Sequence, residues 1–457
     1  MPEPQSIAAL ARQLRRGETT ARDLVAQAIR RADRLDPVLG LFRARFDDAA
    51  ASAAIEADAA LAAGRDRGAL HGIPIGLKDI IQTREGPTTA QSVVDLGRWA
   101  RAADAEVVTR LRRAGAVIVG KLSLAEFAMG VPDQAKPFPL PRNPWDLSRW
   151  AGGSSSGTAG AVAAGVLPGA LGTDTGGSIR LPAAMCGVTG LRPTHGRAPL
   201  AGCLPMAPSL DTIGPVATTA VDCAILFDAL VGARPRVPPV REPAGIRVAV
   251  ADLWAQSDTV HPDQPALFTA AVEVWRRGGA QVRPVQLPHY RDAVAAAQVI
   301  QQVEALAVHR ELFGGPLPGY AEASRRYLAA AAGYRPADLR AAHRVRRATA
   351  RAVRRLLADH DVVLTPTTTM PAPAFDDLAP DRTPGGFHTR YWSLLGLPAL
   401  SVPIGFTSAG LPIGLQLSAA AGADRLVLAA GAWFQRRTGW HRCQPPWGAA
   451  GAGAAGG

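Results

Sequence analysis

The sequence predicts an α/β protein in which strands alternate with helices along the chain. Residues 245–251 (GIRVAVA) have the composition of a strand, residues 265–278 have helical periodicity, and residues 281–286 form another expected strand. Upstream, the apolar run 166–173 precedes a glycine turn and a predicted helix over residues 179–186. This order of strands and helices is typical of a parallel sheet that is covered by helices.

The first part of the chain is predicted to be helical. Apolar residues recur at helical spacing over residues 7–15, 21–35 and 47–61, and the segment 18–20 (ETT) offers a helix cap. The elements expected next are an apolar strand-like run over 70–81, a polar loop over 83–91, a helix over 107–113, a buried strand over 116–120 and a helix over 122–130.

The second half of the chain continues the pattern. Helices are predicted over residues 220–230 and through most of 292–357, a proline-rich crossing segment over 233–243, and buried strands over 361–366, 394–405 and 411–417. Tyr320, Tyr327 and Tyr334 recur every seven residues, which favours one packed helix face over a ligand site. The tail 448–457 (GAAGAGAAGG) cannot pack a core and is expected to be disordered.

The stretch 151–193 carries the residues that point to chemistry. GGSSSG at 152–157 leads into an Ala-rich run that is predicted to be helical, so its serines lie at a helix N-terminus. Further on, residues 174–177 (DTGG) turn the chain into the 179–186 helix, and two glycines before Ser178 leave room for a substrate carbonyl to meet backbone N–H groups. Ser178 is therefore the predicted nucleophile. The alternative, a flexible Gly/Ser linker, is disfavoured by the apolar runs on either side.

The base for Ser178 is predicted to be a lysine. None of the nine histidines has a catalytic context, and His195 lies in a turn-like segment. Arginine stays protonated in proteins, whereas burial can lower the pKa of a lysine until it acts as a base. Only three of the 50 basic residues are lysines. Lys78 is the best candidate because the apolar run 70–81 carries it inward, whereas Lys121 reaches a predicted helix start and Lys136 lies among prolines and is expected to be exposed.

These motifs resemble those of the amidase signature family over nearly the whole chain. The resemblance rests on LHGIPIGLKD, GGSSSGTAGAVAAG, LGTDTGGSIRLPAAMCGVTGLRPT, SLDTIGP, DVVLTPTT and LGLPALSVPIG, and the central pair, with serines 24 residues apart, is the most specific. It implies one large α/β/α domain over residues 1–447 with a mixed central sheet. Within it we expect an N-terminal helical part (1–64), a catalytic core (70–230) and a variable helical pocket region (292–357).

The resemblance also implies the roles of individual residues. Lys78 is the base, Ser154 is a bridging serine with a cis peptide bond, and Ser178 is the nucleophile. The expected oxyanion donors are the backbone N–H groups of Thr175, Gly176, Gly177 and Ser178. Physical reasoning agrees, because a bridging hydroxyl both donates and accepts and can relay a proton between an amine and a second hydroxyl.

Asp174 and Arg180 flank the serine turn. The resemblance makes them an ion pair that fixes the loop, and an ordinary helix-start pair is the open alternative; both are structural roles. Within residues 131–150, the motif RNPWD matches the family. The proline-rich segment that precedes this motif departs from the family pattern. This departure indicates a different pocket shape.

The predicted function is hydrolysis of a carboxamide or urea-type C–N bond, with no metal or organic cofactor required. A second possibility is the glutamine-hydrolysing subunit of an amidotransferase that acts on misacylated tRNA. Arg346, 15 residues before Asp361, has the spacing of the arginine that meets the glutamine carboxylate in those subunits, so it is a weak substrate-binding candidate. Against this possibility, residues 385–393 (GGFHTRYWS) lack the aspartate expected before LGLP. An inactive binding scaffold is disfavoured because all three catalytic positions are intact.

The composition of the chain limits the classes of binding partner that we expect. The net charge of +12 could indicate a nucleic-acid partner, but the densest cluster, residues 340–355, has the pattern of a solvated helix face, so none is expected. The four cysteines are too dispersed for a metal or redox motif and are expected to be free thiols. Without an apolar signal segment or a membrane-length run, the protein is expected in the cytoplasm. The expected partner is a small amide substrate, with a homodimer or a small partner subunit left open.

Overall fold

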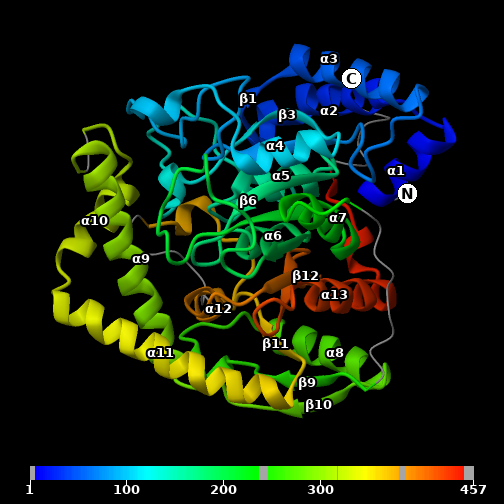
Figure 1. Ribbon diagram of the computed structural model, residues 1–457. Helices are drawn as coiled ribbons and strands as arrows, with labels where there is room; N and C mark the ends of the chain where they lie inside the picture. The colour runs from blue at the N-terminus through cyan, green and yellow to red at the C-terminus, as the bar shows by residue number, and fades with distance from the viewer. Residues whose placement is uncertain (1–5, 236–244, 316–317, 380–387, 447–457) are drawn as a thin grey trace.

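The computed structural model describes residues 6–235, 245–315, 318–379 and 388–446, and these build a mixed sheet of eleven strands surrounded by helices (Figure 1). The strands follow the spatial order β1-β3-β2-β6-β8-β7-β12-β13-β11-β9-β10. Their bounds are β1 Phe42–Arg45, β2 Pro74–Lys78, β3 Val117–Leu122, β6 Gly169–Thr173, β7 Thr189–Arg192, β8 Ile213–Ala217, β9 Arg247–Val250, β10 Gln281–Pro284, β11 Val362–Pro366, β12 Ala399–Phe406 and β13 Pro412–Ser418. The short strands β4 (Arg142–Asn143) and β5 (Asp146–Trp150) form a separate pair.

Parallel and antiparallel pairing occupy different parts of the sheet. The strands β3, β2 and β6 are parallel neighbours, as are β11, β9 and β10, whereas β8, β7, β12 and β13 pair antiparallel between these two groups. The α/β class and the mixed sheet are thus confirmed. The predicted division into domain parts stays a prediction.

Helices cover both faces of the sheet. On the central strand β6, a Cβ atom added at Gly169 would meet Ile7 and Leu226, and one added at Gly172 would meet Ser155 and Ile179. Because residues an odd number of positions apart point to opposite faces of a strand, α1 and α7 lie on one face and α5 and α6 approach the other. The helices of this body are α1 Ile7–Arg16, α2 Ala21–Leu39, α3 Asp47–Ala62, α4 Glu106–Arg113, α5 Ser156–Ala163, α6 Arg180–Cys186, α7 Ala220–Leu230, α8 Gln264–Arg277 and α13 Asp424–Thr438.

The predicted cap at residues 18–20 is present. Thr20 caps α2 and accepts a hydrogen bond from the backbone N–H of Asp23, while the Asp23 carboxylate accepts one from the Thr20 backbone N–H. This reciprocal capping box satisfies two backbone donors that a helix start leaves free.

Four helices form one side of the molecule: α9 Tyr290–Phe313, α10 Glu322–Ala332, α11 Pro336–Asp359 and α12 Thr389–Leu395. The helices α10, α11 and α12 all pack against α9, and Figure 1 shows α9, α10 and α11 framing the left and lower edges of the molecule. The helical character predicted for residues 292–357 is therefore observed.

Two element predictions were wrong. In the segment 122–130, where a helix was predicted, β3 runs to Leu122 and only a short 3-10 turn follows at Glu126–Ala128, because Phe127 and Ala128 both adopt positive φ values. The predicted strand over 394–405 divides into the end of α12 and strand β12, since Gly396 ends the helix in the left-handed conformation, with a φ of 67°.

The three evenly spaced tyrosines also do not share a helix face. Tyr320 precedes α10 and packs on Phe127 and His309, Tyr327 lies within α10, and Tyr334 lies between α10 and α11, where its hydroxyl donates to Gln302. A turn between helices at residues 333–335 breaks the seven-residue period.

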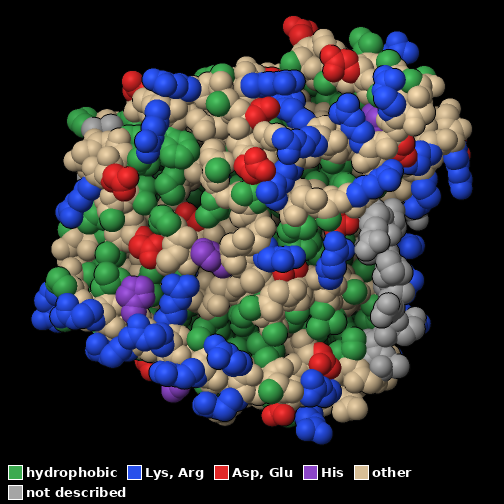
Figure 2. Space-filling view, viewed as in Figure 1, with side chains coloured by type: hydrophobic (Ala, Val, Ile, Leu, Met, Phe, Trp, Pro, Cys, Tyr) green, Lys and Arg blue, Asp and Glu red, His purple; other side chains and the backbone are tan. Residues whose placement is uncertain are grey.

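Positive side chains are spread over the surface. Figure 2 shows Lys and Arg across the visible face, with a dense row over α11. In α11 the arginines at 340, 344, 347, 351, 354 and 355 are exposed, which confirms a solvated helix face. In the described residues no helix is both long and apolar enough to cross a bilayer. The predicted tail 448–457 and most of the crossing segment 233–243 lie outside the described residues.

Candidate active site

Lys78 ends strand β2, whose five residues are all buried. Its side chain is fully buried, and its Nζ donates hydrogen bonds to Ser154 Oγ at 2.7 Å and to Thr173 Oγ1 at 2.8 Å. Burial disfavours the ammonium form and lowers the pKa of Lys78 from 10.5 to about 7, although Asp174 and Asp211 oppose the shift. A substantial fraction of the amine is therefore neutral at neutral pH.

Lys121 is buried on the neighbouring strand but has a different environment. Its Nζ lies 3.3 Å from Asp79 Oδ1 and donates to the Ile81 carbonyl at 2.5 Å and to Thr88 Oγ1 at 2.9 Å. These contacts are those of a structural ion pair. Lys136 is half-buried rather than exposed as predicted, because its ammonium donates to the carbonyl of Gly319.

Ser154 lies just before helix α5, which starts at Ser156. The Gly153–Ser154 peptide bond is cis, as the resemblance implies. Ser155 bonds to the segment that contains Ser178: its backbone N–H donates to the Ser178 carbonyl at 3.1 Å, and its hydroxyl donates to the Thr173 carbonyl at 3.1 Å. The turn that carries Ser154 and the turn that carries Ser178 are thereby bonded to one another.

The turn at residues 174–178 presents Ser178 at the start of α6. Gly177 adopts a φ of +138°, and a Cβ atom there would lie 2.2 Å from Thr389 Oγ1, so a side chain is excluded. Thr389 donates to the Gly176 carbonyl at 2.7 Å, and Thr175 donates to Asp211 at 2.6 Å. In the described part of the chain, the backbone N–H groups of residues 175–178 have no protein acceptor, which leaves them available to a ligand.

Beneath this turn lies a buried ionic cluster of Asp174, Arg180 and Arg192. Arg180 donates to both carboxylate oxygens of Asp174, at 2.9 and 2.8 Å, and Arg192 donates to the Oδ1 atom at 3.1 Å. Burial alone would raise the pKa of Asp174, but the two guanidinium groups outweigh it and hold the pKa well below its usual range. Arg180 also donates to the Thr389 carbonyl at 3.0 Å. The pair predicted from the sequence is thus present, and Arg192, which no sequence pattern singled out, completes it.

A cavity of about 370 Å³ opens over the serines. Ser154, Ser178 and Gly176 form part of its wall, and Ser178 is half-buried. The opposite wall comes from three helices that are distant in sequence: Gln298, Gln301 and Gln302 of α9, Arg326, Tyr327 and Ala330 of α10, and Arg390 of α12. The α9 and α10 residues of this wall fall within 292–357, where the resemblance implied a helical pocket region, but none of them was named as a site residue, and Tyr327 was assigned to a packed helix face.

Arg346, the weak substrate-binding candidate, and His195, the histidine considered as a base and set aside, both lie outside this cavity. Arg346 of α11 donates to Ser209 Oγ at 3.2 Å and to the Ser209 carbonyl at 3.1 Å, and the same hydroxyl donates to Glu304 at 2.5 Å. His195 lies 3.1 Å from the Pro208 carbonyl through its Nε2 atom. Neither residue lines the cavity that contains the serines.

None of the described cysteines lines the cavity that contains the serines. Cys186, Cys203 and Cys223 are buried free thiols and Cys443 is exposed, as expected. Burial raises the pKa of Cys203 to about 12. Within the described ranges, no group of three or more His, Cys, Asp or Glu side chains is arranged to hold a metal ion.

A sequence profile of the Amidase family matches residues 23–428. The chain belongs to the amidase signature family. It is 38% identical to a glutamyl-tRNA(Gln) amidotransferase subunit from Roseiflexus sp. (strain RS-1), over 94% of this chain and 96% of that protein. Among solved structures, it is similar to the crystal structure of an amidase (TM-score 0.85, 32% identity, 95% of this chain and 100% of that chain). It is also similar to native peptide amidase from Stenotrophomonas maltophilia (TM-score 0.81, 28% identity, 97% of this chain and 98% of that chain).

Members of the amidase signature family are hydrolases that act on amide C–N bonds. This chain is an enzyme of that class, which confirms the activity predicted from its sequence. The profile match extends from α2 into the last described α-helix, α13, and includes all the motifs quoted above.

Proposed function

We propose that the enzyme hydrolyses a small carboxamide through an acyl-enzyme on Ser178, with Ser154 and Lys78 as its proton relay. The observation that carries the proposal is the buried Lys78 amine, 2.7 Å from the Oγ atom of Ser154, which lines the cavity together with Ser178. A buried amine with a lowered pKa next to a hydroxyl is a general base suited to neutral pH.

In the proposed reaction, Ser178 Oγ attacks the amide carbonyl carbon and its proton passes to Ser154 Oγ, whose own proton passes to neutral Lys78. The backbone N–H groups of residues 175–178 donate to the developing oxyanion. The relay then returns a proton to the leaving nitrogen as the C–N bond breaks. Water attacks the acyl-enzyme in the second half of the cycle, and the same relay removes its proton.

The proposed function of the ionic cluster is to hold the turn that presents these donors. Arg180 connects Asp174 to the carbonyl of Thr389, and the Thr389 hydroxyl donates to Gly176 within the turn. Asp174 and Arg180 are thus positioning residues, and the buried network fixes the backbone without contacting a substrate.

The second candidate is the glutamine-hydrolysing subunit of an amidotransferase, which is favoured by the 38% identity to the Roseiflexus glutamyl-tRNA(Gln) amidotransferase protein. Glutamine carries an ammonium group besides its carboxylate. The described residues that line the cavity include no Asp or Glu to bind that ammonium, and Arg346 points elsewhere. Simple amide hydrolysis is therefore our first proposal. The cytoplasmic location and the homodimer or small partner subunit remain predictions from the sequence.

The test is ammonia release by the purified protein from a panel of carboxamides that includes glutamine. We expect release from at least one small amide, and a loss of roughly 10³-fold or more in the Ser178→Ala variant, which keeps the fold and removes the nucleophile. Circular dichroism of the variant confirms folding. Wild-type rates in a folded Ser178→Ala variant would contradict the proposal, and release from glutamine alone would favour the second candidate.

A further inference from the structure

The cavity wall opposite the serines is polar and carries positive charge. The helices α9, α10 and α12 contribute three glutamines, one tyrosine and two arginines to it, and no acidic side chain among the described residues lines the cavity. Electrostatic interactions are strong in such partly enclosed sites, because little water screens the charges. The wall is therefore suited to a substrate group of negative charge.

Of the two arginines in this wall, Arg390 is the one whose position the fold restricts more. It follows Thr389, whose hydroxyl donates to the Gly176 carbonyl in the turn before Ser178, and it lines the same cavity as Ser178. The guanidinium is half-buried and donates to Gln298 Oε1 at 3.1 Å. Arg326, by contrast, is an exposed residue at the cavity, and it donates to Glu322 at 2.5 Å. Arg390 is thus the cation that is held inside the cavity.

Unlike Arg390, two other polar groups of this wall have an atom without a hydrogen-bond partner in the described residues. Both Tyr327 Oη and Gln301 Oε1 are buried, and each belongs to a side chain that lines the cavity. Leaving a buried polar atom without a hydrogen-bond partner destabilises the fold, so such atoms need a ligand or water. Gln301 is 7% exposed, and its Oε1 would lie 2.8 Å from a Cβ atom on Gly176. This unsatisfied acceptor therefore lies directly against the turn that holds Ser178.

We propose that the substrate is a small amide that also carries a carboxylate. Arg390 and the Tyr327 hydroxyl donate hydrogen bonds to the carboxylate, and Gln301 Oε1 accepts one from a substrate N–H near the reacting carbonyl. An arginine is suited to this role because its planar guanidinium offers several donors to a carboxylate. The assignment rests on the amide hydrolysis proposed above and defines its substrate class.

The experiment compares matched pairs of substrates: succinate monoamide with butanamide, and glutarate monoamide with pentanamide. Each pair has one chain length and differs in the carboxylate. Ammonia release gives kcat/KM for each compound, and the measured quantity is the ratio of the anionic to the neutral amide. We expect the wild type to favour the anionic amide by roughly 10-fold or more, as expected for a hydrogen bond to a charged group.

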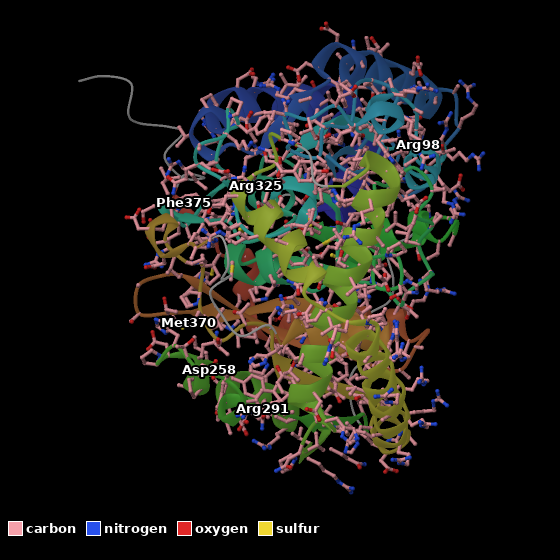
Figure 3. The ribbon with its side chains drawn as sticks, turned by 90° about the vertical axis from the view of Figure 1, so that its left-hand side faces the viewer. Arg98, Asp258, Arg291, Arg325, Met370 and Phe375 are labelled. Carbon is pink, nitrogen blue, oxygen red and sulfur yellow. The ribbon has the colours of Figure 1, made fainter. Side chains whose placement is uncertain are left out.

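Three variants test which side chains cause the preference for the anionic amide. Arg390→Gln should lower the ratio by roughly 10- to 100-fold, mainly through a higher KM for the anionic amide, because the contact is made in the ground state as well as in the transition state. Tyr327→Phe should lower it by about 3- to 10-fold. Arg325→Gln is the control for removal of an arginine. Arg325 lies on α10, the helix that carries Tyr327, but it is exposed and does not line the cavity (Figure 3 labels it). The Arg325→Gln variant should keep the wild-type ratio.

Equilibrium binding separates this inference from the proposed function. Calorimetric titration of the Ser178→Ala variant with the monoamides should give a Kd that rises by roughly 10-fold or more when Arg390→Gln is added. A ratio near one in the wild type, or equal ratios or Kd values with and without Arg390, would overturn the assignment of the carboxylate. If no amide is hydrolysed but the monoamides still bind through Arg390, the hydrolysis proposal fails and the anion site stands.

Discussion

The Nζ atom of Lys78 lies 2.7 Å from Ser154 Oγ, in an environment where burial lowers the lysine pKa to about 7. A base must be neutral to accept a proton, so activity should fall as the pH drops below this pKa and should reach a plateau above it. We predict that kcat/KM for a neutral amide rises with pH along a single ionisation near the Lys78 pKa of about 7.

A histidine base would give a limb at a similar pH, since the ordinary pKa of histidine is about 6.5. His195→Gln is the control, because His195 does not line the cavity that contains the serines. The limb should persist in His195→Gln. Its loss in that variant, or its survival in the residual activity of Lys78→Ala, would contradict the lysine assignment.

The second prediction tests whether the side chain at position 78 must act as a base or only carry a positive charge. Lys78→Arg keeps a positive charge but cannot act as a base at neutral pH. We expect it to lower kcat by roughly 10²- to 10⁴-fold, about as much as Lys78→Ala, because general base catalysis is lost in both. Lys121→Arg is the matched control for a buried lysine, and its effect should appear in stability because Lys121 forms an ion pair with Asp79. Substantial activity in a folded Lys78→Arg variant would show that the site needs only charge.

Much of the site could be predicted from the sequence because it is local. Lys78 stands in an apolar run, and the two serines stand in glycine turns before helices, so hydropathy and turn chemistry are enough to find them. The cavity wall is different. Tyr327, Gln301 and Arg390 come from three helices that meet only in the folded chain. The glutamine and the arginine have no sequence signal, and the even spacing of Tyr327 with Tyr320 and Tyr334 favoured packing over a ligand site.

The element errors have the same origin. The 122–130 segment has a helical composition, but the buried Glu126 carboxylate accepts hydrogen bonds from Ser92 Oγ at 2.7 Å and from the Ala321 backbone N–H at 2.6 Å. These partners are far away in the sequence and hold a non-helical turn. Arg192 was missed for a related reason, because its partner Asp174 lies 18 residues earlier and on a different element.

The third prediction tests the ionic cluster. Asp174→Asn leaves Arg180 and Arg192 buried without a counter-charge, which should destabilise the protein by roughly 3–5 kcal/mol. Thermal unfolding measures the effect. Glu273→Gln is the control, since Glu273 pairs with exposed Arg276 and Arg277 on α8 and should leave the Tm close to the wild-type value. An unchanged Tm for Asp174→Asn would contradict a structural role for the cluster.

The last prediction concerns Gly177, where the backbone adopts a φ of +138° and a Cβ atom would lie 2.2 Å from Thr389 Oγ1. Gly177→Ala must therefore strain the backbone and displace either Thr389 or the turn. Because the turn carries the proposed oxyanion donors, a shift of about 1 Å should lower kcat by roughly 100-fold, while stability falls by roughly 2 kcal/mol.

Gly196→Ala is the matched control: Gly196 has a φ of +80° and no atom within 4 Å of an added Cβ, so only the conformational strain remains. We expect that control to lose about 1 kcal/mol of stability and to keep kcat. Equal losses of kcat in the two variants would contradict the proposal that contact between Thr389 and the turn positions the catalytic backbone.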